Sequence, residues 1–110
     1  MVKSDQCIFS NFIDKVDRRY HQTPDEKVLR KLSERIGNCT IELGIELGLS
    51  VSDIEESIYR YEKDMYRQIY DILLKWKRLS KVKSLHILMK ALQFVRPEGV
   101  HFLMKEFDLQ

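Results

Sequence analysis

Three histidines and two cysteines are the side chains of this 110-residue chain best suited to metal binding or catalysis. They are His21, His86, His101, Cys7 and Cys39. A zinc or redox site typically needs closely spaced pairs such as Cys-x-x-Cys, and none of these five residues has such a partner. The sequence also has no glycine-rich phosphate-binding loop. We therefore predict neither an enzyme nor a cofactor site, and expect each histidine to lie at the surface or at a helix end.

Three carboxylates, on Asp53, Glu55 and Glu56, lie close together in the stretch LGLSVSDIEESI at residues 47–58. A glycine that ends one helix and a serine that begins the next are also typical of a DNA-binding helix-turn-helix. The second helix of that motif enters a groove lined with phosphates, which would repel three carboxylates that no basic residue offsets. We therefore predict an acidic surface without nucleic-acid binding, and keep the helix-turn-helix as an alternative.

The overall composition predicts one compact domain. Apolar residues make 44% of the chain and charged residues 33%, which allows both a core and a charged surface. The net charge of +2 is too small to imply a polyanionic partner. Two cysteines do not make a disulfide framework, and no apolar run approaches the length of a membrane span. We expect a soluble, cytoplasmic domain without membrane insertion.

Helical periodicity runs through nearly the whole chain and predicts an all-α protein. An amphipathic helix at residues 7–20 is followed by a break, so we divide the chain into an N-terminal extension, 1–23, and a domain, 24–110. The first helix of the domain is predicted to begin at Pro24, with Thr23 as its N-cap, and to end at Gly37. Asn38 is the predicted cap of the next helix. Further helices are predicted at residues 51–59, 64–79, 83–95 and 97–107.

The predicted helix at residues 64–79 has an apolar face and a narrow polar stripe. The side chains expected in the core are those of Met65, Ile69, Ile72, Leu73 and Trp76. The stripe expected to face solvent consists of Arg67, Asp71, Lys75 and Arg78.

The order of these features resembles the death domain, the six-helix antiparallel module of apoptotic and innate-immune signalling. The resemblance covers residues 25–107 and depends on an ordered set: Leu47-Gly48-Leu49-Ser50, Asp53-Ile54, Trp76 and Leu85-Leu88-Leu92. Among such domains the chain is most similar to those of small signalling adaptors. The resemblance implies a six-helix antiparallel death-fold bundle, with the helix at 7–20 as an addition. The related caspase-recruitment and death-effector domains stay as alternatives.

Two residues depart from the pattern of this family. Thr40 stands where death domains often carry a tryptophan. Gly44 lies within a predicted helix, where it costs about 1 kcal/mol relative to alanine.

Charges are segregated along the chain. Residues 36–59 contain five acidic and no basic residues, whereas residues 72–97 contain seven basic and no acidic ones. If the two groups occupy different faces, copies can associate head to tail, and a contact of this kind that does not close on itself gives a helical stack.

The resemblance implies that these charges form two protein-interaction patches. The acidic patch would comprise Glu42, Glu46, Asp53, Glu55 and Glu56. The basic patch would comprise Arg30, Lys31, Arg35, Lys75, Lys77, Arg78, Lys81 and Lys83. The resemblance further implies homotypic association with other death-domain proteins, including self-association into helical oligomers. The alternative is that the charges belong to solvated helix faces, because exposed ion pairs contribute little.

Overall fold

The computed structural model describes residues 18–109, and every regular element within this range is a helix. A short 3-10 helix, η1 (Arg18–His21), precedes six α-helices. They are α2 (Glu26–Arg35), α3 (Thr40–Glu46), α4 (Val51–Arg60), α5 (Met65–Leu79), α6 (Leu85–Val95) and α7 (Pro97–Glu106). The predicted all-α class is confirmed for the described residues. The helix predicted at residues 7–20 lies mostly outside them.

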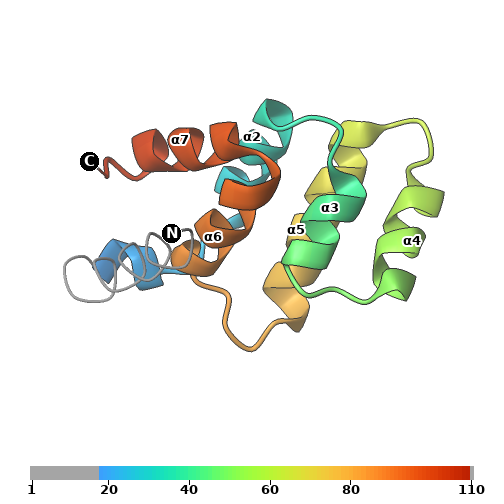
Figure 1. Cartoon of the computed structure of the whole chain (residues 1–110), viewed down its shortest axis with the longest axis horizontal. Helices are drawn as coiled ribbons and strands as arrows, with labels where there is room; N and C mark the ends of the chain where they lie inside the picture. The colour runs from blue at the N-terminus through green and yellow to red at the C-terminus, as the bar shows by residue number, and fades with distance from the viewer. Residues whose placement is uncertain (1–17, 110) are drawn as a thin grey trace.

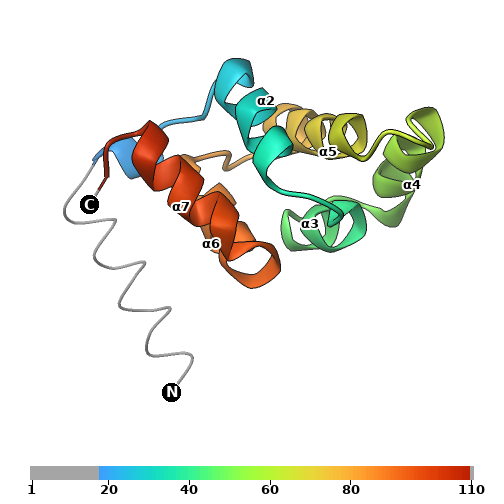
Figure 2. The same cartoon turned by 90° about the horizontal axis from the view of Figure 1, so that it is seen from above.

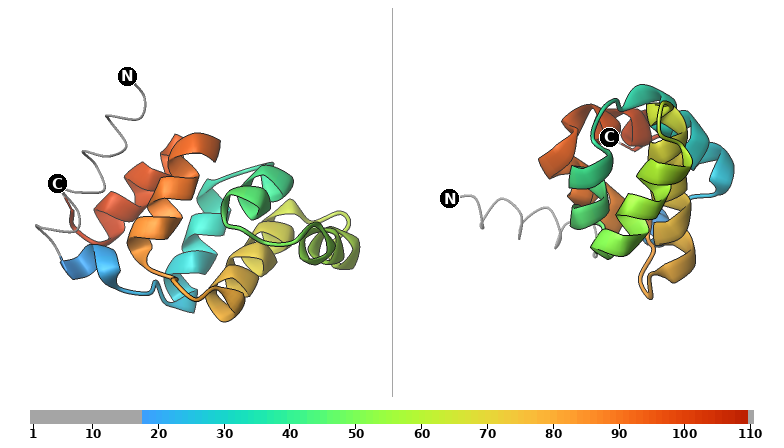
Figure 3. Two further views of the ribbon diagram at one scale, coloured as in Figure 1. Left: turned by 60° about the horizontal axis from the view of Figure 1, so that its bottom comes forward. Right: turned by 90° about the vertical axis from the view of Figure 1, so that its right-hand side faces the viewer.

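Helices α5 and α6 hold the bundle together. Helix α5 contacts α2, α3 and α4, whereas α6 contacts α3, α7 and η1. As a result α4 lies at one end of the molecule and α7 at the other (Figure 1). Seen from above, α2 and α5 lie along one side and α3 and α6 along the other (Figure 2). The C-terminal end of α7 returns to the same end of the molecule as η1 (Figure 3).

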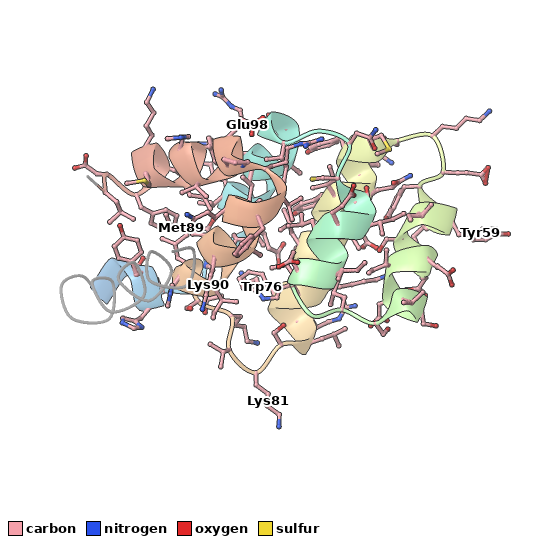
Figure 4. All side chains as sticks on the ribbon, in the orientation of Figure 1. Tyr59, Trp76, Lys81, Met89, Lys90 and Glu98 are labelled. Atoms are coloured by element: carbon pink, nitrogen blue, oxygen red, sulfur yellow. The ribbon has the colours of Figure 1, made fainter. Side chains whose placement is uncertain are left out.

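Trp76 occupies the middle of the core and is fully buried, as predicted from its spacing on α5 (Figure 4). The core residues of α5 before it, Ile69, Ile72 and Leu73, are equally inaccessible. Met65 does not belong to this face as predicted, because it is 38% exposed. It is the first residue of α5, so its side chain lies at the helix end, one turn before the segment that the other helices cover.

Three predicted helix starts are wrong. Helix α6 begins at Leu85 and not at residue 83, because Ser84 is its N-cap and accepts a hydrogen bond from Ile87 N at 3.4 Å. Helix α2 begins two residues later than expected, because the carboxylate of Asp25, not the hydroxyl of Thr23, accepts the capping hydrogen bond from Val28 N at 2.9 Å. Helix α3 has Cys39 at its N-cap position and no side-chain cap, so Asn38 does not cap it.

The turn between α3 and α4 has the predicted ends. Gly48 adopts a positive φ of 83°. The amide of Gly48 donates to Ile45 O at 3.0 Å, and that of Leu49 donates to Gly44 O at 3.0 Å, which is a Schellman ending. The hydroxyl of Ser50 then accepts from Asp53 N at 3.1 Å and caps α4. These local bonds fix the direction in which α4 leaves α3.

The structure explains why Gly44 and Thr40 occupy their positions in α3. A Cβ atom on Gly44 would lie 2.6 Å from Cγ1 of Ile54, so glycine allows α4 to approach α3 closely. Thr40 is buried, and its hydroxyl donates to Gln68 Oε1 on α5 at 3.0 Å. Gln68 in turn donates through Nε2 to Tyr61 O at 2.8 Å. At this position a polar network joins α3 to α5.

Two contacts attach the segment before α2 to the helical bundle. Tyr20 is buried in the same core as the six helices. The amide of Leu85, the first residue of α6, donates to Gln22 O at 2.6 Å. None of the helices within residues 18–109 has the length and apolar character needed to cross a membrane.

Candidate protein-interaction surfaces

The predicted acidic patch is divided between two helices. Glu42 and Glu46 are exposed on α3, and Glu55 and Glu56 are exposed on α4. Asp53 is half-buried in the first turn of α4, where its main chain is engaged in contacts described below. The α3 pair and the α4 group therefore have different surroundings.

Glu42 and Glu46 border a surface groove between α3 and the C-terminal end of α6. We call this the acidic groove; its volume is about 340 Å³ and it is lined by Cys39, Glu42, Ile45, Glu46, Phe94, Val95 and Arg96. Two of these residues are apolar and well exposed, Ile45 at 57% and Phe94 at 56%. The groove thus combines two carboxylates with two exposed apolar side chains, a combination that suits an apolar and basic partner segment.

Arg96 also lines the acidic groove, so one guanidinium group lies beside the two carboxylates. Its guanidinium donates from Nη2 to Asn38 O at 3.1 Å, across the junction between α2 and α3. Burial raises the pKa of the neighbouring Cys39 thiol from its ordinary value near 9 to about 11, although Arg96 acts in the opposite direction. A thiol of this kind is protonated at neutral pH and is a poor nucleophile.

Lys75 is not on the solvent-facing stripe where we predicted it. Its side chain is only 3% exposed and lies between α4 and α5. Its ammonium group lies 2.8 Å from Asp53 O, 2.8 Å from Ser57 Oγ and 2.7 Å from Glu56 Oε1. A second carboxylate, Asp71 Oδ2, lies 3.4 Å away and also accepts a hydrogen bond from Ser57 Oγ at 2.6 Å. Lys75 is thus committed to its own chain and is unavailable to a partner.

The Lys75 cluster also changes the role of Glu56. The hydrogen bond and charge of Lys75, helped by Arg60, hold the pKa of Glu56 below its usual range. Arg60 Nη2 lies 3.6 Å from Glu56 Oε2. Glu56 therefore already has two cationic neighbours within the chain, whereas Glu55, on the same helix, faces solvent.

Two basic residues of α2 contact α7. Lys31 pairs with Glu106 at 3.2 Å, and the guanidinium of Arg35 lies over the ring of Phe102, 5.5 Å from its centroid. Arg30 is exposed on the same helix. These contacts connect the first and last helices of the bundle. The remaining basic residues lie elsewhere.

The other predicted basic residues gather where α5 ends and α6 begins. Lys77, Arg78 and Lys83 line a hollow of about 510 Å³ together with Leu74. We call residues 78–83 the basic loop. Besides Arg78, Lys81 and Lys83 it carries two exposed apolar side chains, Leu79 at 54% and Val82 at 62%. Lys81 points away from the bundle at the edge opposite Glu98 (Figure 4).

Sequence reasoning missed the apolar members of both surfaces. Phe94 lies next to Gln93 and one turn after Lys90, and its position beside these two polar residues was the available signal. For Ile45 the available signal was its position between Glu42 and Glu46, two acidic residues of the same helix. For Leu79 and Val82 the signal was two apolar residues among four basic ones, in a turn.

Nothing in the described part of the chain brings metal-binding residues together. Within residues 18–109, no three His, Cys, Asp or Glu side chains are grouped so that they could hold a metal ion.

Comparisons with protein-family models, with curated proteins and with solved structures found no match to this chain.

Proposed function

We propose that this chain is a non-enzymatic adaptor module that binds other helical domains of its own kind. The observation that carries the proposal is the separation of exposed charge: carboxylates on α3 and α4, and ammonium and guanidinium groups at the basic loop. Complementary charge of this kind selects partners and speeds their encounter, while apolar residues within the contact supply affinity. Both exposed surfaces contain such apolar residues.

The resemblance to death domains supports the same proposal and makes it more specific. The motif set runs through the α3–α4 turn, the buried Trp76 and the leucines of α6, followed by a short last helix. In this proposal the association is homotypic, between death domains, and relays an apoptotic or innate-immune signal in the cytoplasm. The caspase-recruitment and death-effector classes are the alternatives within the same kind of function.

Four residues of the predicted patches already make contacts within the chain. Lys75 and Glu56 engage each other, and Lys31 and Arg35 contact α7. Of the predicted acidic patch, the residues left for a partner are Glu42, Glu46 and Glu55, all exposed. Of the predicted basic patch, the residues left are Arg30, Lys77, Arg78, Lys81 and Lys83, of which Lys77 and Lys83 are half-buried.

The same surface argues against nucleic-acid binding through α4. In a helix-turn-helix, α4 would be the helix that enters the DNA groove, yet Glu55 and Glu56 are both exposed on it. The phosphates of the groove would repel these carboxylates.

Affinity capture with charge-reversed variants tests the proposed function. The immobilised full chain and the variant Glu42→Lys/Glu46→Lys/Glu55→Lys would be compared in the same cell extract, with retained proteins identified by mass spectrometry. We expect the native chain to retain proteins with small helical domains, and the variant, with an unchanged circular dichroism spectrum, to lose them. Glu56 is left intact because its reversal would place a second cation beside buried Lys75. Equal retention by both chains would contradict the proposal.

A further inference from the structure

We propose that the basic loop docks on the surface of a bilayer that contains anionic lipids. The inference goes beyond the proposed function, because it gives the loop a lipid partner and not a protein partner. It depends on positive charge that no carboxylate pairs with, on exposed apolar side chains among the cations, and on the position of the loop at one edge of the molecule. The contact is with the bilayer surface, so it requires no helix that spans a membrane.

The cations around the basic loop have no anionic partner among the described residues. Other basic side chains pair with carboxylates, as Lys31 and Lys75 do. Within residues 18–109, by contrast, no carboxylate forms an ion pair with the cations at the end of α5 and in the loop, namely Lys77, Arg78, Lys81 and Lys83. A surface of anionic lipids attracts clustered cations of this kind.

The hollow beside the basic loop suits the phosphate group of a lipid. Lys77, Arg78 and Lys83 line its volume of about 510 Å³, together with Thr23 and Leu74. Glu26 also lines it, so three cations face one carboxylate. Basic side chains bind phosphate through charge-assisted hydrogen bonds, and the excess of cations therefore favours an anionic headgroup.

Two apolar side chains lie among these cations. Leu79 is 54% exposed and Val82 is 62% exposed, one before and one after Lys81. Water gives such side chains no favourable burial, whereas the boundary between lipid headgroups and acyl chains does. Apolar burial at this boundary adds to the attraction between cations and anionic lipids, which is how surface-bound proteins are held at membranes.

The basic loop also lies where a flat surface can reach it. It joins the end of α5 to the start of α6 and forms the lower edge of the molecule in Figure 1. Glu42 and Glu46 line the groove beside the other end of α6, a helix of 11 residues that is about 16 Å long. Anionic lipids attract the loop and repel these carboxylates, so the molecule should turn its loop toward the bilayer and leave its acidic groove open to a protein partner.

Removal of the apolar side chains of the loop is the first test. The apolar variant is Leu79→Ser/Val82→Ser, made in the full chain. Its matched control is Ile41→Ser/Ile45→Ser, which removes two aliphatic side chains of similar exposure, 53% and 57%, from α3. All four side chains are exposed, so both variants should keep the native circular dichroism spectrum and unfolding midpoint.

Reversal of charge in the loop is the second test. The charge variant is Arg78→Glu/Lys81→Glu. Its matched control is Lys63→Glu/Lys105→Glu, which changes the net charge equally at exposed positions before the start of α5 and near the end of α7. Neither pair is buried, so the fold should again be retained.

Binding would be measured by co-sedimentation with vesicles of phosphatidylcholine alone and with vesicles that contain about 30% phosphatidylserine. We expect the native chain and both controls to bind the anionic vesicles at low salt, and to bind them less in high salt. Each loop variant should bind them at least about tenfold more weakly, and no chain should bind the neutral vesicles as well as the anionic ones. Soluble glycerophosphoserine at the concentration of the vesicle lipid should not displace the native chain, because it provides neither a charged surface nor an apolar boundary.

The position of the loop in the bilayer gives an independent readout. Val82→Trp places a fluorophore in the loop and Ile41→Trp places one on α3, while Trp76 stays buried in the core of both chains. On anionic vesicles the emission of Val82→Trp should shift to shorter wavelength and be quenched by brominated acyl chains. The emission of Ile41→Trp should change little.

Three results would overturn this inference. One is a native chain that does not bind anionic vesicles at low salt, and another is a loop variant of either kind that binds them as well as the native chain does. The third is displacement of the native chain by glycerophosphoserine without a change in the emission of Val82→Trp, which would make the hollow a site for free phosphate. The capture experiment depends on carboxylates of α3 and α4, so the adaptor function and the lipid contact can each fail while the other holds.

Discussion

The ammonium group of Lys75 on α5 lies 2.7 Å from the carboxylate of Glu56 on α4. Lys75 belongs to residues 72–97, which contain only basic charges, and Glu56 to residues 36–59, which contain only acidic ones. The side chain of Lys75 is 3% exposed, and that of Glu56 is 55% exposed. The charge segregation visible in the sequence is therefore partly neutralised within the molecule. What remains exposed is a smaller set of charges, of which Glu42 and Glu46 lie beside Ile45 and Phe94.

Replacing Lys75 by methionine should destabilise the fold. Lys75→Met keeps a flexible chain of similar length but removes the cation between Glu56 and Asp71 and one of the two side-chain donors to Asp53 O. Asp71 and Ser57, which are largely covered by α4 and α5, then lose a hydrogen-bonded cation, so the free energy of unfolding should fall by about 1–3 kcal/mol. Urea unfolding followed by circular dichroism measures this. Lys77→Met, on the same helix and only half-buried, is the control and should change stability by less than about 0.5 kcal/mol. Equal stability of the two variants would show that the cluster contributes nothing.

Replacing Gly44 by alanine should also destabilise the protein, against the helix propensity of alanine. The added Cβ would lie 2.6 Å from Cγ1 and 2.7 Å from Cδ1 of Ile54, which is itself buried. We expect a net loss of up to about 2 kcal/mol, because overpacking costs about 1–3 kcal/mol and alanine regains only about 1 kcal/mol in helix propensity.

Two further variants make the Gly44 prediction specific. Gly37→Ala has no heavy atom within 4 Å of the new Cβ, so it should be neutral or slightly stabilising. Gly44→Ala/Ile54→Ala should lose less stability than the sum of the two single changes, because the truncated side chain leaves space for the new methyl group. A stabilised Gly44→Ala variant would refute the close approach of α3 and α4.

The sequence was sufficient to predict features that depend on local chemistry. Gly48 ends α3 and Ser50 begins α4 through hydrogen bonds between residues three positions apart, and the periodicity of α5 was enough to place Trp76 in the core. The start of α2 was wrong because Thr23 and Asp25 are both good capping residues and local chemistry does not choose between them.

The position of Lys75 could not be predicted from α5 alone. Helical periodicity correctly placed Lys75 on the polar side of α5. However, α4 covers that part of the helix and brings Asp53 O and Ser57 to the ammonium group. The acidic groove was missed for the same reason, since it forms only where α3 and α6, distant in sequence, lie side by side.

The buried thiol of Cys39 predicts how stability depends on pH in alkaline solution. Its pKa is raised from near 9 to about 11 in the folded protein, so the neutral thiol favours folding fully below pH 9, and this contribution is lost as the pH rises to about 11. The unfolding free energy of the native chain should therefore fall by up to about 2 kcal/mol more than that of Cys39→Ala over this interval. Urea unfolding at a series of pH values measures the difference. Parallel curves for the two chains would contradict the assignment.

The most direct test of the account is the affinity of a purified partner, taken from the capture experiment, for three versions of this chain. Isothermal titration would compare the native chain, Glu42→Lys/Glu46→Lys and the control Val51→Ser at low and high salt. If the exposed carboxylates of α3 bind the partner, the charge-reversed chain should bind at least about tenfold more weakly, the control should bind as the native chain does, and salt should weaken native binding. Equal affinity of the native and charge-reversed chains at both salt concentrations would contradict the account.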